Sequence, residues 1–158
     1  MEQWISENIS ELSPPLNWIR LEGGHSNLTY RIEDSSGKKA VIRRPPQGVL
    51  LPKAHDMSRE WALISALGPT PVPVPEALGF CESPDITGAW FYVMGLIDGR
   101  PLYNNEETLE WVPEEKRPQL AYSFVDVLAD LHAIVPLSLI HISEPTRLLS
   151  IGDGGFGV

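Results

Sequence analysis

The chain has 158 residues, of which 42% are hydrophobic, enough for one substantial core. Its formal net charge of -9 argues against the basic surface that non-specific nucleic-acid binding requires, so we expect no nucleic-acid partner. Cys81 is the only cysteine, which excludes an internal disulfide or a cysteine-based zinc site. The acidic start MEQWISENIS lacks the basic region of a signal peptide, and no long apolar run follows it. We therefore expect a cytoplasmic protein without a membrane partner.

The first part of the chain predicts one helix and three strands. Apolar residues recur at helical spacing within residues 2–12, which predicts a short helix that ends before Pro14. The segments LNWIRLE, LTYRIED and KKAVIRR predict three strands within residues 16–44. The turn SSGK joins the second strand to the third, so we expect an antiparallel meander.

The middle of the chain predicts one helix and two more strands. The proline-rich segment RPPQGVLLPKAHD predicts a loop, and DMSREWALISAL then predicts a helix with Met57, Trp61 and Ile64 on one apolar stripe. Gly68 and the following proline end this helix. An extended proline-rich connector follows. EALGFCE and AWFYVMGLI predict two further strands joined by the turn SPDITG.

The last predicted elements are a loop over DGRPLYNNEE and a long helix over residues 114–134. Pro113 stands at the entry of this helix, and two glutamates follow in the first turn, where the helix dipole favours acids. The expected buried face of the helix consists of Leu120, Phe124, Val127, Leu128 and Leu131.

The character of the sequence changes after Pro136. Residues 137–158 have no clean period, and their glycine-rich end has nothing obvious to pack against. The segment SLIHISEPTR resembles a translated sequencing-adapter read-through. We interpret the tail as foreign or disordered sequence, and a genuine variable tail is the alternative.

The stretch EGGHSN, between the first two predicted strands, is the first candidate site. Gly23 and Gly24 lack a Cβ, so backbone N–H groups there can come close to a phosphate. Ser26 and Asn27 can add side-chain donors, and His25 can also reach a phosphate. A plain β-hairpin connection is the alternative, because short glycine motifs are weak evidence by themselves.

The segment AVIR places Val41 and Arg43 on one face of a strand and Ile42 on the other. The order of the predicted elements is that of the small lobe of a protein-kinase-like fold, in which a lysine at this position binds nucleotide phosphates. Arginine offers a planar fork where lysine offers a point charge, so the role could persist with altered geometry. A solvated arginine is the alternative, and we expect the neighbouring Arg44 to be one.

Glu60 flanks the apolar stripe of its helix and should therefore lie near the sheet. A carboxylate there needs a partner, and Arg43 is the natural one. This pair corresponds to the strand lysine and helix glutamate that position phosphates in kinases. An exposed glutamate paired with a nearby cation is the alternative.

The fifth predicted strand ends in Met94, Gly95 and Leu96. In a kinase-like fold the backbone after this strand binds the adenine edge, although a buried strand ending in a turn would look the same. The four histidines show no metal-ligand spacing, so we assign no metal site.

Several segments together resemble the aminoglycoside phosphotransferase-like family, in particular its branch associated with acyl-CoA dehydrogenases. The resemblance extends from about residue 17 to about residue 135 and rests on GGHSNLTYRI, AVIRRPPQGVLLPKAHDMSREWALISAL, VPVPEALGFCESPDITGAWFYVMGLIDGRPL and LADLHA. It implies an α+β fold, with a protein-kinase-like small lobe of five antiparallel strands and one packed helix. The expected divisions are a small lobe over 1–97, a hinge and the start of a large lobe over 98–136, and the tail.

Members of this family transfer the γ-phosphate of ATP to a hydroxyl of a small molecule. The resemblance therefore implies ATP as cofactor and an unidentified small-molecule acceptor as partner. It also implies that Gly23 to Asn27 cover the phosphates, that Arg43 binds the nucleotide and pairs with Glu60, and that Met94 to Leu96 form the hinge.

The sequence departs from the family where catalysis would occur. Family members carry a catalytic loop of the form HGD…N and a later magnesium-binding aspartate, and this chain has neither HGD nor a DWE-like segment. Asp153 in IGDGGFG superficially resembles the aspartate of the kinase DFG motif, but neither the strand nor the catalytic loop that should precede that motif is found here. We therefore expect an incomplete phosphotransferase without catalytic residues, with Mg²⁺ bound only in a complete protein. A non-catalytic kinase-like module that binds a nucleotide or a protein is one alternative, and a structural α+β domain is another.

Overall fold

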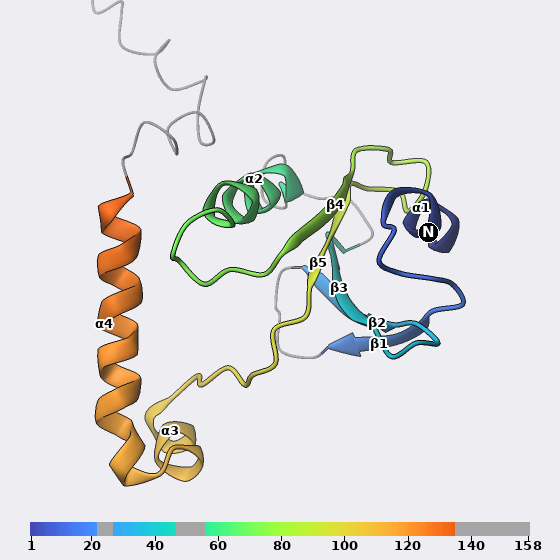
Figure 1. The fold of residues 1–158 in the computed structure, drawn as a ribbon. Coiled ribbons are helices and arrows are strands. Elements are labelled where there is room, and N and C mark those ends of the chain that lie inside the picture. Colours follow the sequence, from blue (N-terminus) through green and yellow to red (C-terminus); the bar gives the residue numbers. More distant parts are fainter. Residues whose placement is uncertain (22–26, 47–55, 135–158) are drawn as a thin grey trace, which may run out of the picture.

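A computed structural model of the chain describes residues 1–21, 27–46 and 56–134. Its centre is an antiparallel sheet with the order β1-β2-β3-β5-β4. The strands are β1 (Asn17–Leu21), β2 (Leu28–Glu33), β3 (Lys39–Arg44), β4 (Ala77–Cys81) and β5 (Phe91–Gly95). Figure 1 shows how the chain leaves β3, passes through a helix and returns as β4 at the far edge. The predicted meander and the predicted five-stranded sheet are both confirmed.

The pairing register divides the sheet into two chemically different faces. Arg43 lies opposite Tyr92 of β5 and Thr29 of β2, so these three side chains share a face. Ile42 lies opposite Val93 and belongs to the other face. The alternation expected for AVIR is therefore present.

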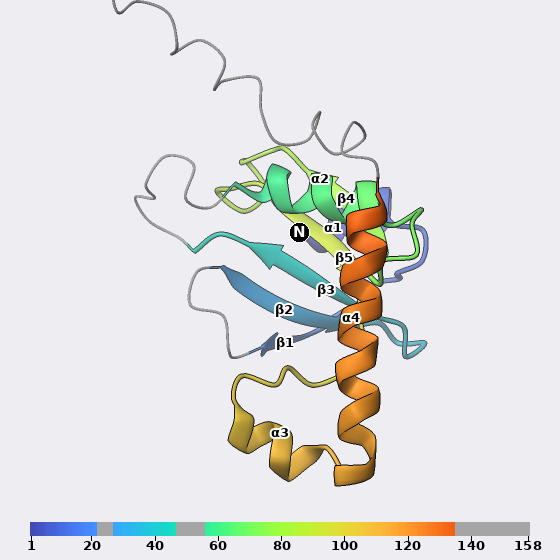
Figure 2. The same ribbon diagram turned by 90° about the vertical axis from the view of Figure 1, so that its left-hand side faces the viewer.

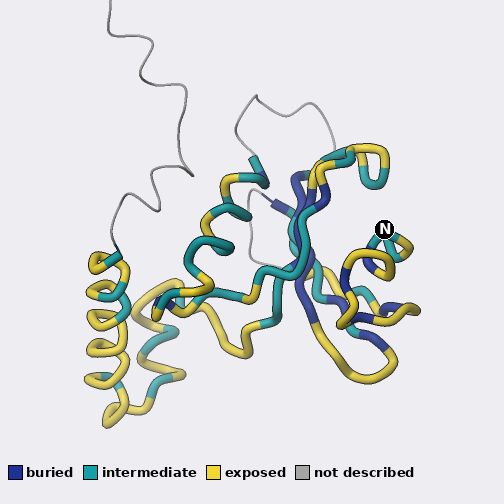
Figure 3. The backbone as a smooth tube through the Cα atoms, turned by 45° about the horizontal axis from the view of Figure 1, so that its top comes forward, coloured by how far each residue is buried: buried dark blue, intermediate teal, exposed yellow. Residues whose placement is uncertain are grey.

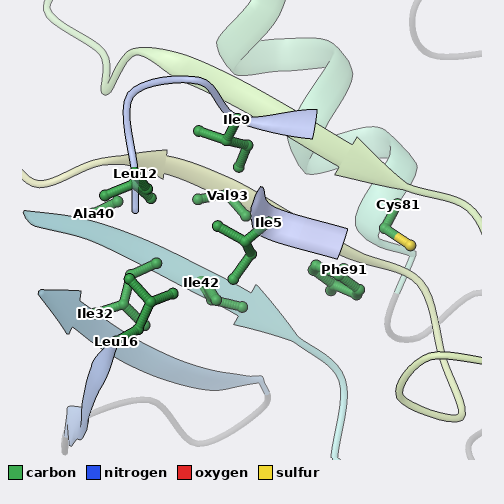
Figure 4. Close-up of a cluster of buried hydrophobic side chains, with 10 residues drawn as sticks. All are labelled: Ile5, Ile9, Leu12, Leu16, Ile32, Ala40, Ile42, Cys81, Phe91 and Val93. Carbon is green, nitrogen blue, oxygen red and sulfur yellow. The ribbon is translucent and has the colours of Figure 1, made fainter. Parts of the chain in front are cut away.

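The apolar face of the sheet carries the main core. The helix α1 (Glu2–Asn8) is shorter than predicted, because Ile9 already has extended backbone. Ile5 and Ile9 are nevertheless fully buried, in one cluster with Ile42 and Phe91 (Figure 4). The members of this core are Ile5, Ile9, Leu12, Leu16, Ile32, Ala40, Ile42, Cys81, Phe91 and Val93. Burial of this many aliphatic and aromatic side chains supplies the main stabilisation of the sheet.

The helix α2 (Met57–Leu67) lies on the opposite face, beside β4 and β5 (Figure 1). Asp56 begins it by accepting a hydrogen bond from the backbone N–H of Ser58 at 3.0 Å. Trp61 stacks on Phe80 with ring centroids 5.8 Å apart, which anchors the helix to the edge of the sheet. The sequence predicted this helix and its apolar stripe correctly.

The prediction that Arg44 is a solvated arginine was wrong. Its side chain is only 8% exposed and donates to the carbonyl oxygen of Thr87 at 2.9 Å and to that of Pro45 at 3.2 Å. Arg44 shares the face of Ile42, where Pro45, the next residue, and Thr87, in the link between β4 and β5, supply the carbonyl acceptors. A buried guanidinium is tolerated there because these acceptors replace water.

The loop predicted over DGRPLYNNEE includes residues 105–107, but these residues begin the helix α3 (Asn105–Trp111), which the sequence did not predict. Asn104 caps it by accepting the N–H of Glu107 at 2.8 Å, and the Glu107 carboxylate accepts the N–H of Tyr103 at 2.9 Å. This reciprocal arrangement is close to a capping box. The signal was present in the sequence NNEE, whose polar composition had suggested a turn.

The helix predicted over residues 114–134 begins as a short 3₁₀ turn, η1 (Glu114–Lys116), and continues as the α-helix α4 (Arg117–Ala133). Its expected buried face is exposed: Leu120 is 42% exposed and Phe124 is 71% exposed. Leu128 and Leu131 are also exposed, and Val127 is only half-buried. The period was correct, but no described element covers this face (Figures 2 and 3).

None of the helices in the described part of the chain has the length and hydrophobicity to cross a bilayer. The predictions for residues 137–158 lie outside the described residues.

The turn between β2 and β3 depends on the Asp34 carboxylate. This carboxylate accepts hydrogen bonds from the hydroxyl and N–H of Ser36 and from the N–H groups of Lys38 and Ser13. The Ser36 hydroxyl is the largest cause of the lowered pKa of Asp34, and the backbone donors add to it against the opposing effect of burial.

Asp34→Asn should therefore destabilise the protein at neutral pH. A carboxyl group whose pKa is lower in the folded state stabilises the fold above its unfolded value, near 3.8, and this contribution is lost as the pH falls through the folded value. Urea denaturation at pH 7 and near pH 3 should show the gap between the variant and the parent shrinking in acid. Asp85→Asn, at an exposed position of another turn, is the matched control and should show no such gap.

Candidate functional site

The carboxylate of Glu60 is the centre of a polar cluster between α2 and the sheet. Its Oε2 lies 2.7 Å from Nε of Arg43 and accepts the hydroxyl of Tyr92 at 2.8 Å. Its Oε1 accepts the side-chain amide of Asn27 at 3.0 Å. One carboxylate therefore joins β3, β5, α2 and the residue that precedes β2. The ion pair expected between Arg43 and Glu60 is present.

Backbone geometry accounts for this convergence. Arg43 and Tyr92 are opposite each other in the antiparallel ladder of β3 and β5, which places both side chains on the face that α2 covers. The Asp56 cap fixes where α2 begins. Trp61, one residue after Glu60, packs on Phe80 and fixes the rotation of the helix.

The guanidinium of Arg43 meets Glu60 with one edge only. Nε makes the short contact, and Nη2 lies 3.4 Å from Oε1. Nε–H itself makes no hydrogen bond in the described part of the chain, and the described contacts with Glu60 involve Nε and Nη2 but not Nη1. We infer that the outer edge of the guanidinium, on the Nη1 side, faces away from the carboxylate. Both side chains are about one third exposed, at 35% and 34%, so the pair lies at an accessible surface of the lobe. A second anion can approach the outer edge without displacing Glu60.

Tyr92 is the most deeply buried member of the cluster, at 3% exposure. Burial raises the pKa of its phenol strongly, and the hydrogen bond and negative charge of Glu60 raise it further, while Arg43 opposes this increase. The phenol therefore stays neutral and remains a donor to Glu60 across the physiological pH range.

The other predicted site residues are only partly described. Gly23, Gly24, His25 and Ser26 lie outside the described residues. Asn27 is described and buried, and its amide is directed to Glu60. The predictions that these residues bind phosphates stay predictions.

Met94 and Gly95 end β5, and Leu96 follows outside any strand or helix. Met94 lies opposite Val41, so it shares the face of Arg43. The N–H of Gly95 donates to the carbonyl oxygen of Glu76 at 2.8 Å and is therefore already occupied. A ligand held by the backbone here would have to use other groups of this segment.

Sequence reasoning missed Tyr92 and the role of Asn27 as a partner of Glu60. The alternation of β5 could have placed Tyr92 beside Met94 on the face of Arg43. In the part of the chain that the structure describes, no group of three or more His, Cys, Asp or Glu side chains is arranged to hold a metal ion. His132 is exposed on α4.

The sequence matches the model of the phosphotransferase enzyme family over residues 17–150, most of its length. The chain belongs to this family. The match includes part of the segment that we interpreted as an atypical tail. The family resemblance predicted from the sequence is thus confirmed, and the fold is that of a kinase-like phosphotransferase.

Relatives in animals are acyl-CoA dehydrogenase family proteins. The chain is 36% identical over 138 residues to acyl-CoA dehydrogenase family member 11 of Rattus norvegicus, a match to 85% of this chain. It is 32% identical over 120 residues to family member 10 of Mus musculus, a match to 76% of this chain. The matched parts make up only 17% and 11% of those two proteins.

A solved structure has the same fold. The crystal structure of a Ralstonia eutropha JMP134 protein, assigned as an aminoglycoside phosphotransferase, matches with a TM-score of 0.70 at 25% identity. The match covers 87% of this chain and 38% of the other. It confirms the predicted α+β architecture.

Removing Glu60 should destabilise the protein more than removing its cationic partner. Glu60→Ala leaves the buried hydroxyl of Tyr92 without its acceptor, which costs about 1–3 kcal/mol. Arg43→Ala loses a partly exposed ion pair that solvent screens, which costs about 1 kcal/mol or less. Urea denaturation of both variants measures the difference. Equal losses, or a larger loss for Arg43→Ala, would contradict the assignment of Glu60 as the centre of the cluster.

Proposed function

We propose that this lobe binds ATP and that Arg43 holds its phosphates in a reaction that transfers the γ-phosphoryl group to a hydroxyl of a small molecule. Membership of the phosphotransferase family supports the reaction class. The side-on ion pair between Arg43 and Glu60 is the observation that carries the proposal, because it orients a cation and leaves one edge of it for an anion. A bidentate contact between that edge and a phosphate is geometrically favoured.

The contacts of Glu60 reduce the electrostatic repulsion between its carboxylate and a nearby phosphate. A bare carboxylate would repel a nucleotide. Here Asn27 and Tyr92 donate to the two carboxylate oxygens, and Arg43 supplies the full positive charge. The cluster therefore presents a cation, instead of an acid, to an approaching anion.

The pairing register places the described ends of the connection between β1 and β2 near Arg43. Leu21 of β1 lies opposite Thr29 of β2, which in turn lies opposite Arg43 of β3. Residues 22–26 connect β1 and β2 at this row of the sheet, so both ends of the connection are fixed one or two strands from Arg43. This supports the proposal that Gly23, Gly24, His25 and Ser26 contribute donors to the same phosphates, with Asn27 tying the end of the segment to Glu60.

Val41 and Met94 share the face of Arg43 and offer an apolar surface for the base of the nucleotide. Thr29 and Arg31 of β2 lie between this surface and two further apolar residues of the same face on β1, Ile19 and Leu21. The latter two are partly exposed, at 38% and 37%. We propose that the adenine lies against this surface, with backbone groups near Met94 to Leu96 at its edge.

The complete reaction needs groups beyond this lobe. The sequence lacks the HGD…N loop, and the chain matches only 38% of the crystallised relative. We propose that the acceptor site, the catalytic aspartate and the Mg²⁺ ligands belong to the remainder of a complete phosphotransferase. This chain should therefore bind nucleotide weakly and transfer little phosphate by itself.

Arg43→Ala should weaken binding of a non-hydrolysable magnesium–ATP analogue about 10-fold or more, because charge-assisted contacts to phosphate are lost. Isothermal titration calorimetry of the 158-residue chain measures the affinity. Arg20→Ala is the matched control: Arg20 is an exposed arginine on the other face of the sheet, and its loss should leave the affinity unchanged.

Two results would count against the proposal. Unchanged affinity in Arg43→Ala would show that the nucleotide binds elsewhere. Absence of nucleotide binding, both by this chain and by a complete gene product that contains it, would favour a structural or protein-binding module.

A further inference from the structure

Tyr92 contacts the centre of the site but was assigned no role by the sequence. We propose that Tyr92 is a positioning residue of the nucleotide site, whose hydroxyl fixes the Glu60 carboxylate so that Arg43 pairs with it side-on. The inference rests on the proposed function, because it describes how the phosphate-binding edge of Arg43 is set.

The buried hydroxyl of Tyr92 restricts the position of the Glu60 carboxylate. Its hydroxyl donates to Oε2 of Glu60 at 2.8 Å, and this same oxygen lies 2.7 Å from Nε of Arg43. Oε2 therefore joins a side chain that is almost fully buried to one that is about one third exposed. Exposed ion pairs lose much of their energy to side-chain motion and solvent. A buried hydroxyl on the shared oxygen restricts the carboxylate and so restricts its partner.

Packing holds Tyr92 itself in place. Its ring lies 6.2 Å from the ring of Trp61 on α2, and Trp61 also stacks on Phe80. Its backbone is part of β5, the strand paired with both β3 and β4. The hydroxyl is thus held by the sheet and by α2 together, whereas the side chains of Glu60 and Arg43 have more rotatable bonds and are more flexible.

The same arrangement ties α2 to the sheet at the position of Glu60. Aromatic packing through Trp61 holds the helix at the sheet edge, and the Tyr92–Glu60 hydrogen bond fixes its rotation one residue earlier. Loss of the hydroxyl alone would keep the aromatic packing but release the carboxylate. Arg43 would then pair with Glu60 in several geometries, and only some would direct its outer edge toward a phosphate.

The test is Tyr92→Phe, which keeps the ring and removes the hydroxyl. We expect the affinity of the chain for the non-hydrolysable magnesium–ATP analogue to fall about 3- to 10-fold, in the range of a single hydrogen bond. Tyr30→Phe is the matched control. Tyr30 is on β2 on the opposite face, packed edge-to-face on Trp18, and its hydroxyl should not affect affinity.

A double-mutant cycle separates positioning from a general loss of structure. If Tyr92 acts through Glu60, Tyr92→Phe should weaken binding in the parent but have little further effect in a Glu60→Gln background. The same fold-change in both backgrounds would overturn the proposal, and so would parent-like affinity in Tyr92→Phe.

A nucleotide-independent measurement keeps the proposal testable if the proposed function is wrong. The Arg43 Nε–H resonance in a ¹H–¹⁵N spectrum reports the ion pair directly, and Arg43→Ala assigns it. Tyr92→Phe should shift this resonance and speed its exchange with solvent, and Tyr30→Phe should not. An unchanged resonance overturns the positioning role. A changed resonance, where neither this chain nor the complete gene product binds nucleotide, supports the positioning role and overturns only the proposed function.

Discussion

The antiparallel register between β3 and β5 is the constraint on which the candidate site depends. It sets Arg43 opposite Tyr92 on the face that α2 covers. A slip of one residue would exchange the faces, and Arg44 would take the place of Arg43. The two neighbouring arginines lie in very different surroundings. Arg44 is buried among carbonyl oxygens on the core side, while Arg43 stays accessible beside a carboxylate.

The two faces divide stability from chemistry. The face toward α1 is filled by aliphatic and aromatic side chains, and this burial supplies the free energy that holds the strands in register. The opposite face can therefore carry charged and polar groups at positions where an apolar residue would pack better. Their cost is limited because Glu60 accepts hydrogen bonds from the side chains of Asn27, Arg43 and Tyr92.

Periodicity in the sequence predicted the strands and α2, because these follow from a repeat of two or of 3.6 residues, and the pairing of Arg43 with Glu60 also needed the kinase-like order of the elements. Alternation could have placed Tyr92 on the face of Arg43, but its contact with Glu60 depends on how Trp61 orients α2 against β5. Periodicity failed for Arg44, because the carbonyl oxygen of Thr87 comes from a link distant in sequence. Local capping by Asn104 was visible but was outweighed by the turn-like composition of NNEE.

For the long helix α4, the period of the apolar residues predicted the helix but not whether its apolar face is buried. Its apolar stripe has the expected period, yet Phe124 and its neighbours are exposed, because a period shows that a face needs cover without identifying the cover. The described contacts of the cluster around Glu60, in contrast to the apolar face of α4, need no further covering element. Its members belong to β3, β5, α2 and the start of β2, and the described contacts of Glu60 involve no group from α3 or α4. The described part of the proposed phosphate-binding cluster therefore depends on the sheet and α2, and not on α3 or α4.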